Sequence, residues 1–185
     1  YDTDNGSWAI RHSSSGKLAT HSIETAASKQ QMSNTPVQAD YDGDGRTDIA
    51  VWHAGSGNWS IMFSSNSAIR QFRLGGNGDV PVPADFDGDG RADIAVFRTA
   101  DNTWSILESS SDKIKGIIYG RTGDVYLAPA DYTGDGKADI AIIEKGKWSV
   151  RESETGEIVV HVFGTASSIP VPADHDGDGT VDIAV

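Results

Sequence analysis

The chain has 185 residues, 37% of them hydrophobic, with 21 glycines, no cysteine and a formal net charge of −12. Its length allows a sizeable core, and its glycine content favours short strands and tight turns over long helices. The lack of cysteine excludes disulfides and thiolate metal sites, the lack of an 18-residue apolar stretch argues against membrane insertion, and the acidity disfavours nucleic acid as a partner.

A tryptophan segment is the first predicted element. Trp8-Ala9-Ile10 has counterparts of the form Trp-Ser-Ile or Trp-Ser-Val at residues 59–61, 104–106 and 148–150. In the second copy, Trp59, Ile61 and Phe63 fall on one face and Ser60 and Ser64 on the other, with Met62 the exception, a pattern that predicts a half-buried strand. Periodic aromatics usually follow a burial pattern, so we expect these tryptophans to pack in the core rather than to stack against sugars.

An acidic nonapeptide follows, preceded by a proline-containing segment such as Pro81-Val82-Pro83-Ala84. Its pattern is Asp-x-Asp-Gly-Asp-Gly-x-x-Asp, unbroken in three copies and carrying Thr133 at position three in another. The copies are residues 40–48, 85–93, 131–139 and 174–182, so their first aspartates are 45, 46 and 43 residues apart. Such spacing indicates a propeller or a solenoid.

Two more strands are predicted in each repeat. Each acidic nonapeptide leads into Ile-Ala-Val or Ile-Ala-Ile, the short apolar run of a strand that is buried on both faces. The runs are residues 49–51, 94–96, 140–142 and 183–185. A further strand is expected at residues 69–74, 114–119 and 158–163. Three or four short strands in about 45 residues predict one propeller blade.

The expected fold is therefore an all-β, four-bladed propeller in a single domain, residues 1–185. Its repeats are approximately 9–51, 52–96, 97–142 and 143–185, with residues 1–8 completing the last blade. If Val185 were joined to Tyr1, Trp8 would keep the eight-residue spacing that separates Val51 from Trp59. Three arrangements fit this spacing: one ring closed by its own chain, a neighbour's blade completed by homo-oligomerisation, or part of a longer array.

The acidic loops suit calcium, which takes six to eight oxygen ligands. Magnesium fits less well, and zinc or copper would require nitrogen or sulfur ligands. The loop resembles that of an EF-hand, but position twelve is Val51, Val96, Ile142 or Val185 instead of glutamate. We expect carboxylates at positions one, three, five and nine and a backbone carbonyl at position seven, with the third site the weakest. The expected ligands are Asp40, Asp42, Asp44, Arg46 and Asp48; Asp85, Asp87, Asp89, Arg91 and Asp93; Asp131, Thr133, Asp135, Lys137 and Asp139; and Asp174, Asp176, Asp178, Thr180 and Asp182.

Isolated Asp/Gly stretches are often only solvated turns, but four copies in phase with other landmarks argue against that interpretation. Three of the loops carry four of these aspartates each and the other carries three, which together make fifteen of the 27 acidic residues. One divalent cation per loop would change the net charge from −12 to −4. The acidity is thus explained mainly by ligands, and chelators are expected to destabilise the fold.

Residues 81–96, Pro-Val-Pro-Ala-Asp-Phe-Asp-Gly-Asp-Gly-Arg-Ala-Asp-Ile-Ala-Val, resemble the FG-GAP/VCBS repeat. That repeat occurs in integrin α-subunit propellers and in many secreted bacterial proteins. The resemblance extends over essentially the whole chain and implies a calcium-binding β-propeller, with Thr133 the one departure among the ligands. The family's usual ring has about seven blades. Its members include adhesion receptors, lectins and accessory domains of carbohydrate-active enzymes.

No catalytic arrangement emerges from the remaining residues. The five histidines occupy unrelated repeat positions, and His175 replaces Tyr41, Phe86 and Tyr132 as a ring-shaped packing residue. Trp52 breaks the tryptophan period and is the better candidate for an exposed contact, although chance exposure would explain it as well. Any export signal would have been removed or would lie outside these residues, since no basic or apolar segment follows Tyr1.

We therefore expect a secreted, non-enzymatic binding or adhesion module that takes glycans. The alternative is a structural or protein-interaction domain of a larger secreted protein, with an extracellular protein as its partner. The differing loops weigh against a repeat lectin, which should keep the same polar and aromatic residues at each site.

Overall fold

The computed structural model describes residues 1–2, 7–23, 34–121, 123 and 125–185. These residues form fourteen β-strands, as expected for an all-β protein. In this part of the chain no helix is long and apolar enough to cross a membrane. The chain divides into two compact units, Tyr1–Asp79 and Val80–Val185.

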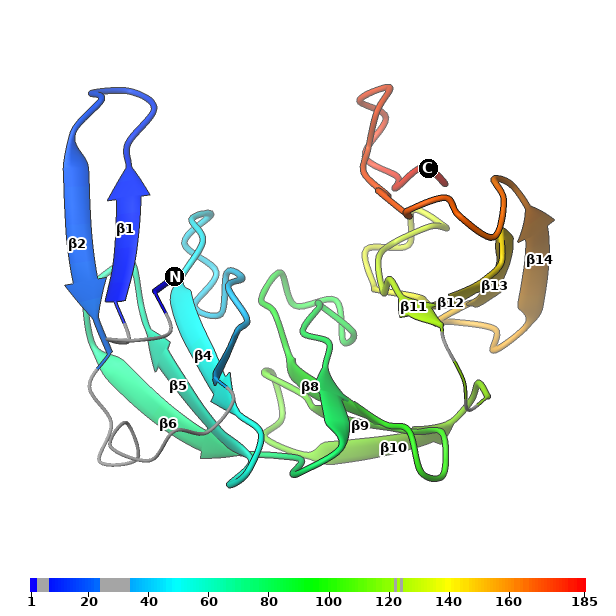
Figure 1. Ribbon diagram of the computed structural model, residues 1–185, viewed down its shortest axis with the longest axis horizontal. Coiled ribbons are helices and arrows are strands. Elements are labelled where there is room, and N and C mark those ends of the chain that lie inside the picture. Colours follow the sequence, from blue (N-terminus) through cyan, green and yellow to red (C-terminus); the bar gives the residue numbers. More distant parts are fainter. Residues whose placement is uncertain (3–6, 24–33, 122, 124) are drawn as a thin grey trace. The chain divides into compact units, whose positions relative to one another are not determined.

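Three antiparallel sheets have four strands each, in chain order (Figure 1). We call these sheets blades 1, 2 and 3. Blade 1 consists of β3 (Asn34–Pro36), β4 (Ile49–His53), β5 (Asn58–Met62) and β6 (Ile69–Arg73). Blade 2 consists of β7 (Asp79–Pro81), β8 (Ile94–Arg98), β9 (Thr103–Leu107) and β10 (Ile114–Ile118). Blade 3 consists of β11 (Tyr126–Leu127), β12 (Ile140–Glu144), β13 (Lys147–Arg151) and β14 (Ile158–Val162).

The predicted strands occupy fixed places in each blade. The Ile-Ala-Val runs are the second strands, β4, β8 and β12, and their alanines are fully buried, as predicted. The tryptophan segments are the third strands, and the further predicted strands are the fourth. The short first strands lie in the segments that precede the acidic loops.

A two-stranded sheet lies at the N-terminal end of the described chain. It consists of β1 (Ser7–Arg11), which contains Trp8, and β2 (Leu18–Ser22). By sequence these strands correspond to the third and fourth strands of a blade. In the first unit, Trp8 and Ile10 pack against a core that includes Ile49 and Val51 of β4.

Adjacent blades share a core in the second unit. Phe97, Trp104 and Ile106 of blade 2 belong to the same buried cluster as Ile140 and Ile142 of blade 3. The β-branched and aromatic side chains of strands buried on both faces thus supply the apolar contact between blades.

The repeated tryptophans behave as core residues. Trp59, Trp104 and Trp148 are fully buried, which confirms the prediction. Each indole Nε1–H donates to the carbonyl fifteen residues later, that of Leu74, Tyr119 or Phe163, at 3.0–3.2 Å. The donor therefore keeps a partner inside the core, and the bond ties the third strand to the end of the blade.

Two expectations about blade 1 were wrong. Trp52 is not an exposed contact: it is buried beside Trp59, and its Nε1–H donates to the Leu74 carbonyl at 3.2 Å. Ser60, expected on a solvent face, is buried as well. Both strands of this hairpin are covered on two faces, so period-two alternation underestimates their burial.

The fourth repeat departs from the prediction of a buried strand. Residues 183–185 form no strand, and Val185 is 44% exposed, whereas the equivalent Val51 and Val96 are buried. The hydrogen bond from Val171 N–H to the Ala184 carbonyl, 3.0 Å, nevertheless matches the bond that joins first and second strands elsewhere. His175 is exposed rather than packed, with Nε2 3.4 Å from the Val171 carbonyl oxygen.

Candidate metal sites

A single backbone frame closes all four acidic loops. In each, an isolated antiparallel bridge joins the alanine before position one to the aspartate at position nine. The bridging pairs are Ala39 and Asp48, Ala84 and Asp93, Ala130 and Asp139, and Ala173 and Asp182. Because the bridge fixes both ends, the intervening carboxylates are held in a compact loop between the first and second strands.

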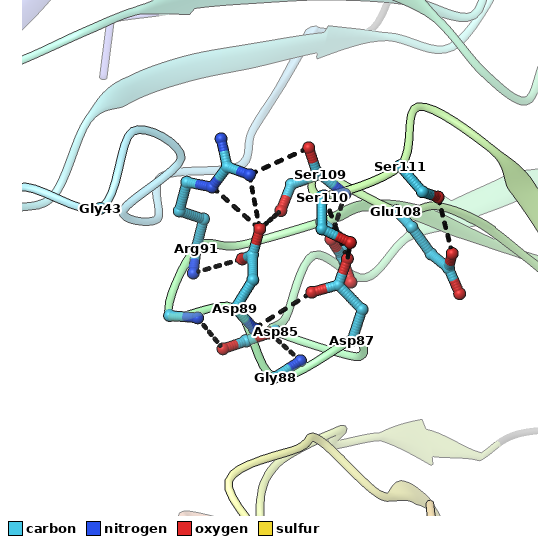
Figure 2. Close-up of polar contacts among 12 residues, drawn as sticks. Gly43, Asp85, Asp87, Gly88, Asp89, Arg91, Glu108, Ser109, Ser110 and Ser111 are labelled. Atoms are coloured by element: carbon cyan, nitrogen blue, oxygen red, sulfur yellow. Dashed lines mark hydrogen bonds and ion pairs between the residues drawn. The ribbon is translucent and has the colours of Figure 1, made fainter.

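The aspartate at position one organises the turn. In the second loop, Asp85 accepts hydrogen bonds from the N–H groups of Gly88 and Gly90, at 2.7 and 2.8 Å (Figure 2). Both glycines have positive φ, 82° and 83°, which residues with a Cβ rarely adopt. Asp40, Asp131 and Asp174 hold the corresponding glycines in the same way. The glycines of the motif are therefore needed for the backbone to curl around this carboxylate.

The aspartate at position nine is buried in the first three loops. Asp93 accepts the N–H of Phe86 at 2.8 Å and that of Ser109 at 2.7 Å. Asp48 and Asp139 have equivalent partners. Burial raises the pKa of Asp93 to about 6, and the charge of Asp87 acts in the same direction. Burial also raises the pKa of Asp48 and of Asp139.

Serines from the turn between the third and fourth strands contact positions three and five. In the second repeat, Ser110 Oγ donates to Asp87 at 2.7 Å and Ser109 Oγ donates to Asp89 at 2.8 Å (Figure 2). Asp89 also forms an ion pair with Arg91 at 2.5 Å. Although desolvation raises the pKa of Asp89, the hydrogen bonds from Arg91 and Ser109 bring it below its ordinary value.

These turn serines were not predicted as part of the site. They follow Trp59 and Trp104 by five and six residues and Trp148 by five, so this spacing was the available signal. In the first repeat, Ser64 and Ser65 donate to Asp44 and Asp42. In the third, Ser153 donates to Asp135 at 2.6 Å, but the next position holds Glu154.

Three loops bring carboxylate oxygens from positions one, three and nine together. Within each group these oxygens lie within 4.8 Å of one another. The groups are Asp40, Asp42 and Asp48; Asp85, Asp87 and Asp93; and Asp174, Asp176 and Asp182. The described residues of the third loop give no such group, in keeping with Thr133 at position three.

The donor chemistry of these groups fits a hard cation. All the donors are oxygens, and a carboxylate oxygen that accepts one N–H keeps a further lone pair for an ion. Clustered, partly buried carboxylates repel one another, and a divalent cation would relieve that repulsion. The ligand roles of the position-five aspartates and of the backbone carbonyls of Arg46, Arg91, Lys137 and Thr180 stay predictions.

Successive loops are hydrogen-bonded to each other in the second unit. The Asp85 carbonyl accepts the N–H of Ala138 at 2.6 Å, and the Asp131 carbonyl accepts that of Val181 at 2.8 Å. Position one of each loop is thus tied to position eight of the next. These bonds join the backbones of neighbouring loops directly.

Comparison with known proteins supports the assignment of the repeats. The sequence matches the FG-GAP-like repeat family over residues 40–96 and 85–142, more than half of the chain. No curated protein sequence matches the chain.

The structure is similar to that of a lectin from Agrocybe aegerita, described as recognising non-reducing terminal N-acetylglucosamine specifically. The TM-score is 0.62 and the sequence identity 17%, over 95% of this chain and 53% of the lectin. The chain spans about half the length of that protein, and the likeness is one of fold alone, a β-propeller.

Proposed function

The chain belongs to the FG-GAP-like repeat family, and on that premise we propose that it is a secreted, calcium-binding β-propeller module that recognises glycans and catalyses no reaction. The observation that carries the calcium part is the convergence of three carboxylates in each of three loops. Glycan binding is supported by the lectin with the same fold. Rigid strands that present differing loops give a suitable frame for such recognition.

Residues 40–48, 85–93 and 174–182 would hold the calcium ions. There the ion would supply positive charge that neutralises each cluster and holds the loop closed. The chain's own contribution is a loop fixed by the bridge at its ends and by glycine N–H groups at position one. The turn serines would then orient the aspartates at positions three and five.

A protein partner is the second candidate, because exposed apolar side chains gather in the C-terminal part of the chain. Val162, Phe163, Ile169 and Val171 are each at least half exposed. Exposed apolar surface of this kind is typical of protein contacts. On this alternative the module would join other parts of an extracellular assembly.

A glycan array in millimolar calcium, repeated with a chelator, tests the recognition part. We expect calcium-dependent binding to a coherent set of glycans, with terminal N-acetylglucosamine included among the probes. Circular dichroism of the same sample should show that the protein is folded. A blank array with folded, calcium-loaded protein would contradict glycan recognition and favour the protein partner.

Calorimetric titration with calcium tests the metal part independently. Asp87→Asn removes the position-three carboxylate of the second loop and should remove one bound calcium or weaken it at least about tenfold. Asp112→Asn is the matched control, because Asp112 is exposed, lies outside the loops and has a positive φ that asparagine also adopts. Equal titrations of the two variants would contradict the assignment.

A further inference from the structure

The outermost strand of blade 3 has an open edge. Among the described residues, β14 pairs only with β13. At the two ends of this ladder, the Phe163 N–H donates to the Gly146 carbonyl and the Glu152 N–H donates to the Glu157 carbonyl. Bonded pairs alternate along an antiparallel ladder, so the backbone N–H and C=O groups of residues 158, 160 and 162 point away from β13. These groups form a template on which a further strand can pair.

The sequence of β14 lacks the features that usually protect such an edge. It reads Ile-Val-Val-His-Val, all five residues are exposed, and none is proline, glycine, lysine or arginine. The outermost strands of the other two blades carry such residues, Arg70 and Arg73 in β6 and Lys115 and Gly116 in β10. A strand of β-branched residues without charges is therefore the edge best suited to pairing in the described blades.

The apolar row on this edge lies on the face turned toward blade 2. In the register of blade 3, Val160 is opposite Ser149 and Ser149 is opposite Ile142, so these three side chains share one face. Ile142 packs in the cluster that includes blade 2. Blade 2 has all four strands, yet Ile158, Val160 and Val162 are 56%, 48% and 81% exposed. The neighbouring blade thus leaves this row open to solvent.

Opposite charges lie at the two ends of the edge. Lys145 and Lys147 are exposed at the end of Val162, and the nearby Glu144 is ion-paired with Arg121 at 2.7 Å. The other end, next to Ile158, carries three carboxylates and one guanidinium. These residues are Glu152, Glu154, Glu157 and Arg151. Two antiparallel copies of the edge therefore place the acidic end of each copy beside the basic end of the other.

We propose that two copies of this chain pair through antiparallel β14 strands, with Val160 of each copy opposite Val160 of the other. Ile158 then lies opposite Val162, and the outward N–H and C=O groups of both copies meet. The contact is isologous, so it closes after two copies and joins two four-stranded blades into one sheet. A second copy is the occupant because the chain itself supplies both the matching aliphatic row and the complementary charges. The inference does not depend on glycan recognition.

Sedimentation equilibrium of the 185-residue chain in millimolar calcium tests the proposal. We expect a mass that rises with concentration toward twice 19.6 kDa. A mass of 19.6 kDa over the whole concentration range would overturn the proposal and leave the edge to a strand of another protein.

A lysine at the centre of the contact locates it. Val160→Lys places two ammonium groups opposite each other across the two-fold axis, and should weaken association at least about tenfold. Gly116→Lys is the matched control, because Gly116 has the corresponding position in β10 and a Cβ there meets nothing within 4 Å. Circular dichroism should show that both variants are folded. Equal association by the two variants would overturn the proposal.

A charge exchange tests the antiparallel orientation. Lys147→Glu and Glu157→Lys each replace attraction by repulsion at both ends of the contact, and each should weaken self-association by about threefold or more. An equimolar mixture of the two variants restores opposite charges, so it should associate more tightly than either variant alone. A mixture that associates no more tightly than the separate variants would contradict the proposed orientation.

Discussion

The aspartate at position nine joins three parts of a repeat. Asp93 accepts one N–H from its own loop, at Phe86, and one from the turn after the third strand, at Ser109. It also belongs to the carboxylate group with Asp85 and Asp87. A buried carboxylate without an opposite charge is costly, which is why its pKa is raised. A cation at this position would remove that cost.

Through Asp93, acid should stabilise the metal-free folded chain but weaken its binding of calcium. Its pKa in the folded chain is about 6, against an ordinary value of 3.8. The folded state therefore binds the proton more tightly, and the stability this group contributes to the metal-free chain is lost as pH rises through about 6. Calcium requires the ionised form, so calcium affinity should fall as pH decreases below about 6.

Calcium titrations at about pH 7.5 and about pH 5 measure this linkage. The part of the pH dependence of calcium affinity that comes from the second loop should disappear in Asp93→Asn, because asparagine cannot bind a proton there. Asp112→Asn is the control with the same loss of charge on the surface. Calcium affinity that is unchanged between the two pH values would contradict the prediction.

The acidic loop and the turn after the third strand act as one element. In the first two repeats an aspartate at position three meets a serine, Asp42 with Ser65 and Asp87 with Ser110. The third repeat changes both positions, to Thr133 and Glu154. The paired change replaces both members of this contact, and the described residues of the third loop give no three-carboxylate group.

Restoring both residues should create a stronger third site. Thr133→Asp supplies the carboxylate, and Glu154→Ser supplies the hydroxyl that meets position three in the first two repeats. We expect calorimetry of the double variant to show calcium binding at least about tenfold tighter at this loop, about 1.4 kcal/mol, or one additional ion. Glu154→Ser alone is the control. A double variant that binds calcium like the wild type would show that Thr133 does not limit this site.

Sequence pattern predicted the elements of each repeat because they follow local rules. The β-branched runs after the loops and the tryptophan segments identify second and third strands, and glycine spacing identifies the loops. Burial that depends on neighbours was less predictable: Trp52 and Ser60 are covered by surrounding strands, whereas residues 183–185 lack such cover. The turn serines were missed because they reach the loops across 18 to 23 residues of sequence.

At the scale of the whole molecule, fifteen of the 27 acidic residues lie in the four acidic loops. The loop at residues 40–48 lies in the unit Tyr1–Asp79, and the other three lie in the unit Val80–Val185. In the second unit the loops are also bonded to one another through Ala138 and Val181. Calcium would therefore stabilise contacts between repeats as well as single loops.

Removal of calcium should destabilise the second unit more than the first. When the free calcium concentration is about a hundred times the dissociation constant of a site, calcium binding there contributes about 2.7 kcal/mol to folding. The second unit contains two groups of three carboxylates and the first unit contains one. We expect chelator to lower the melting temperature and to speed hydrogen exchange at the Ala138 and Val181 amides most. Magnesium in place of calcium is the control and should restore less stability, because it rarely uses sites made wholly of protein ligands. An unchanged melt in chelator would mean that the hydrogen bonds within and between loops hold the repeats without an ion. An equal loss of hydrogen-exchange protection in both units would instead mean that the stabilisation by calcium does not depend on the hydrogen bonds between loops.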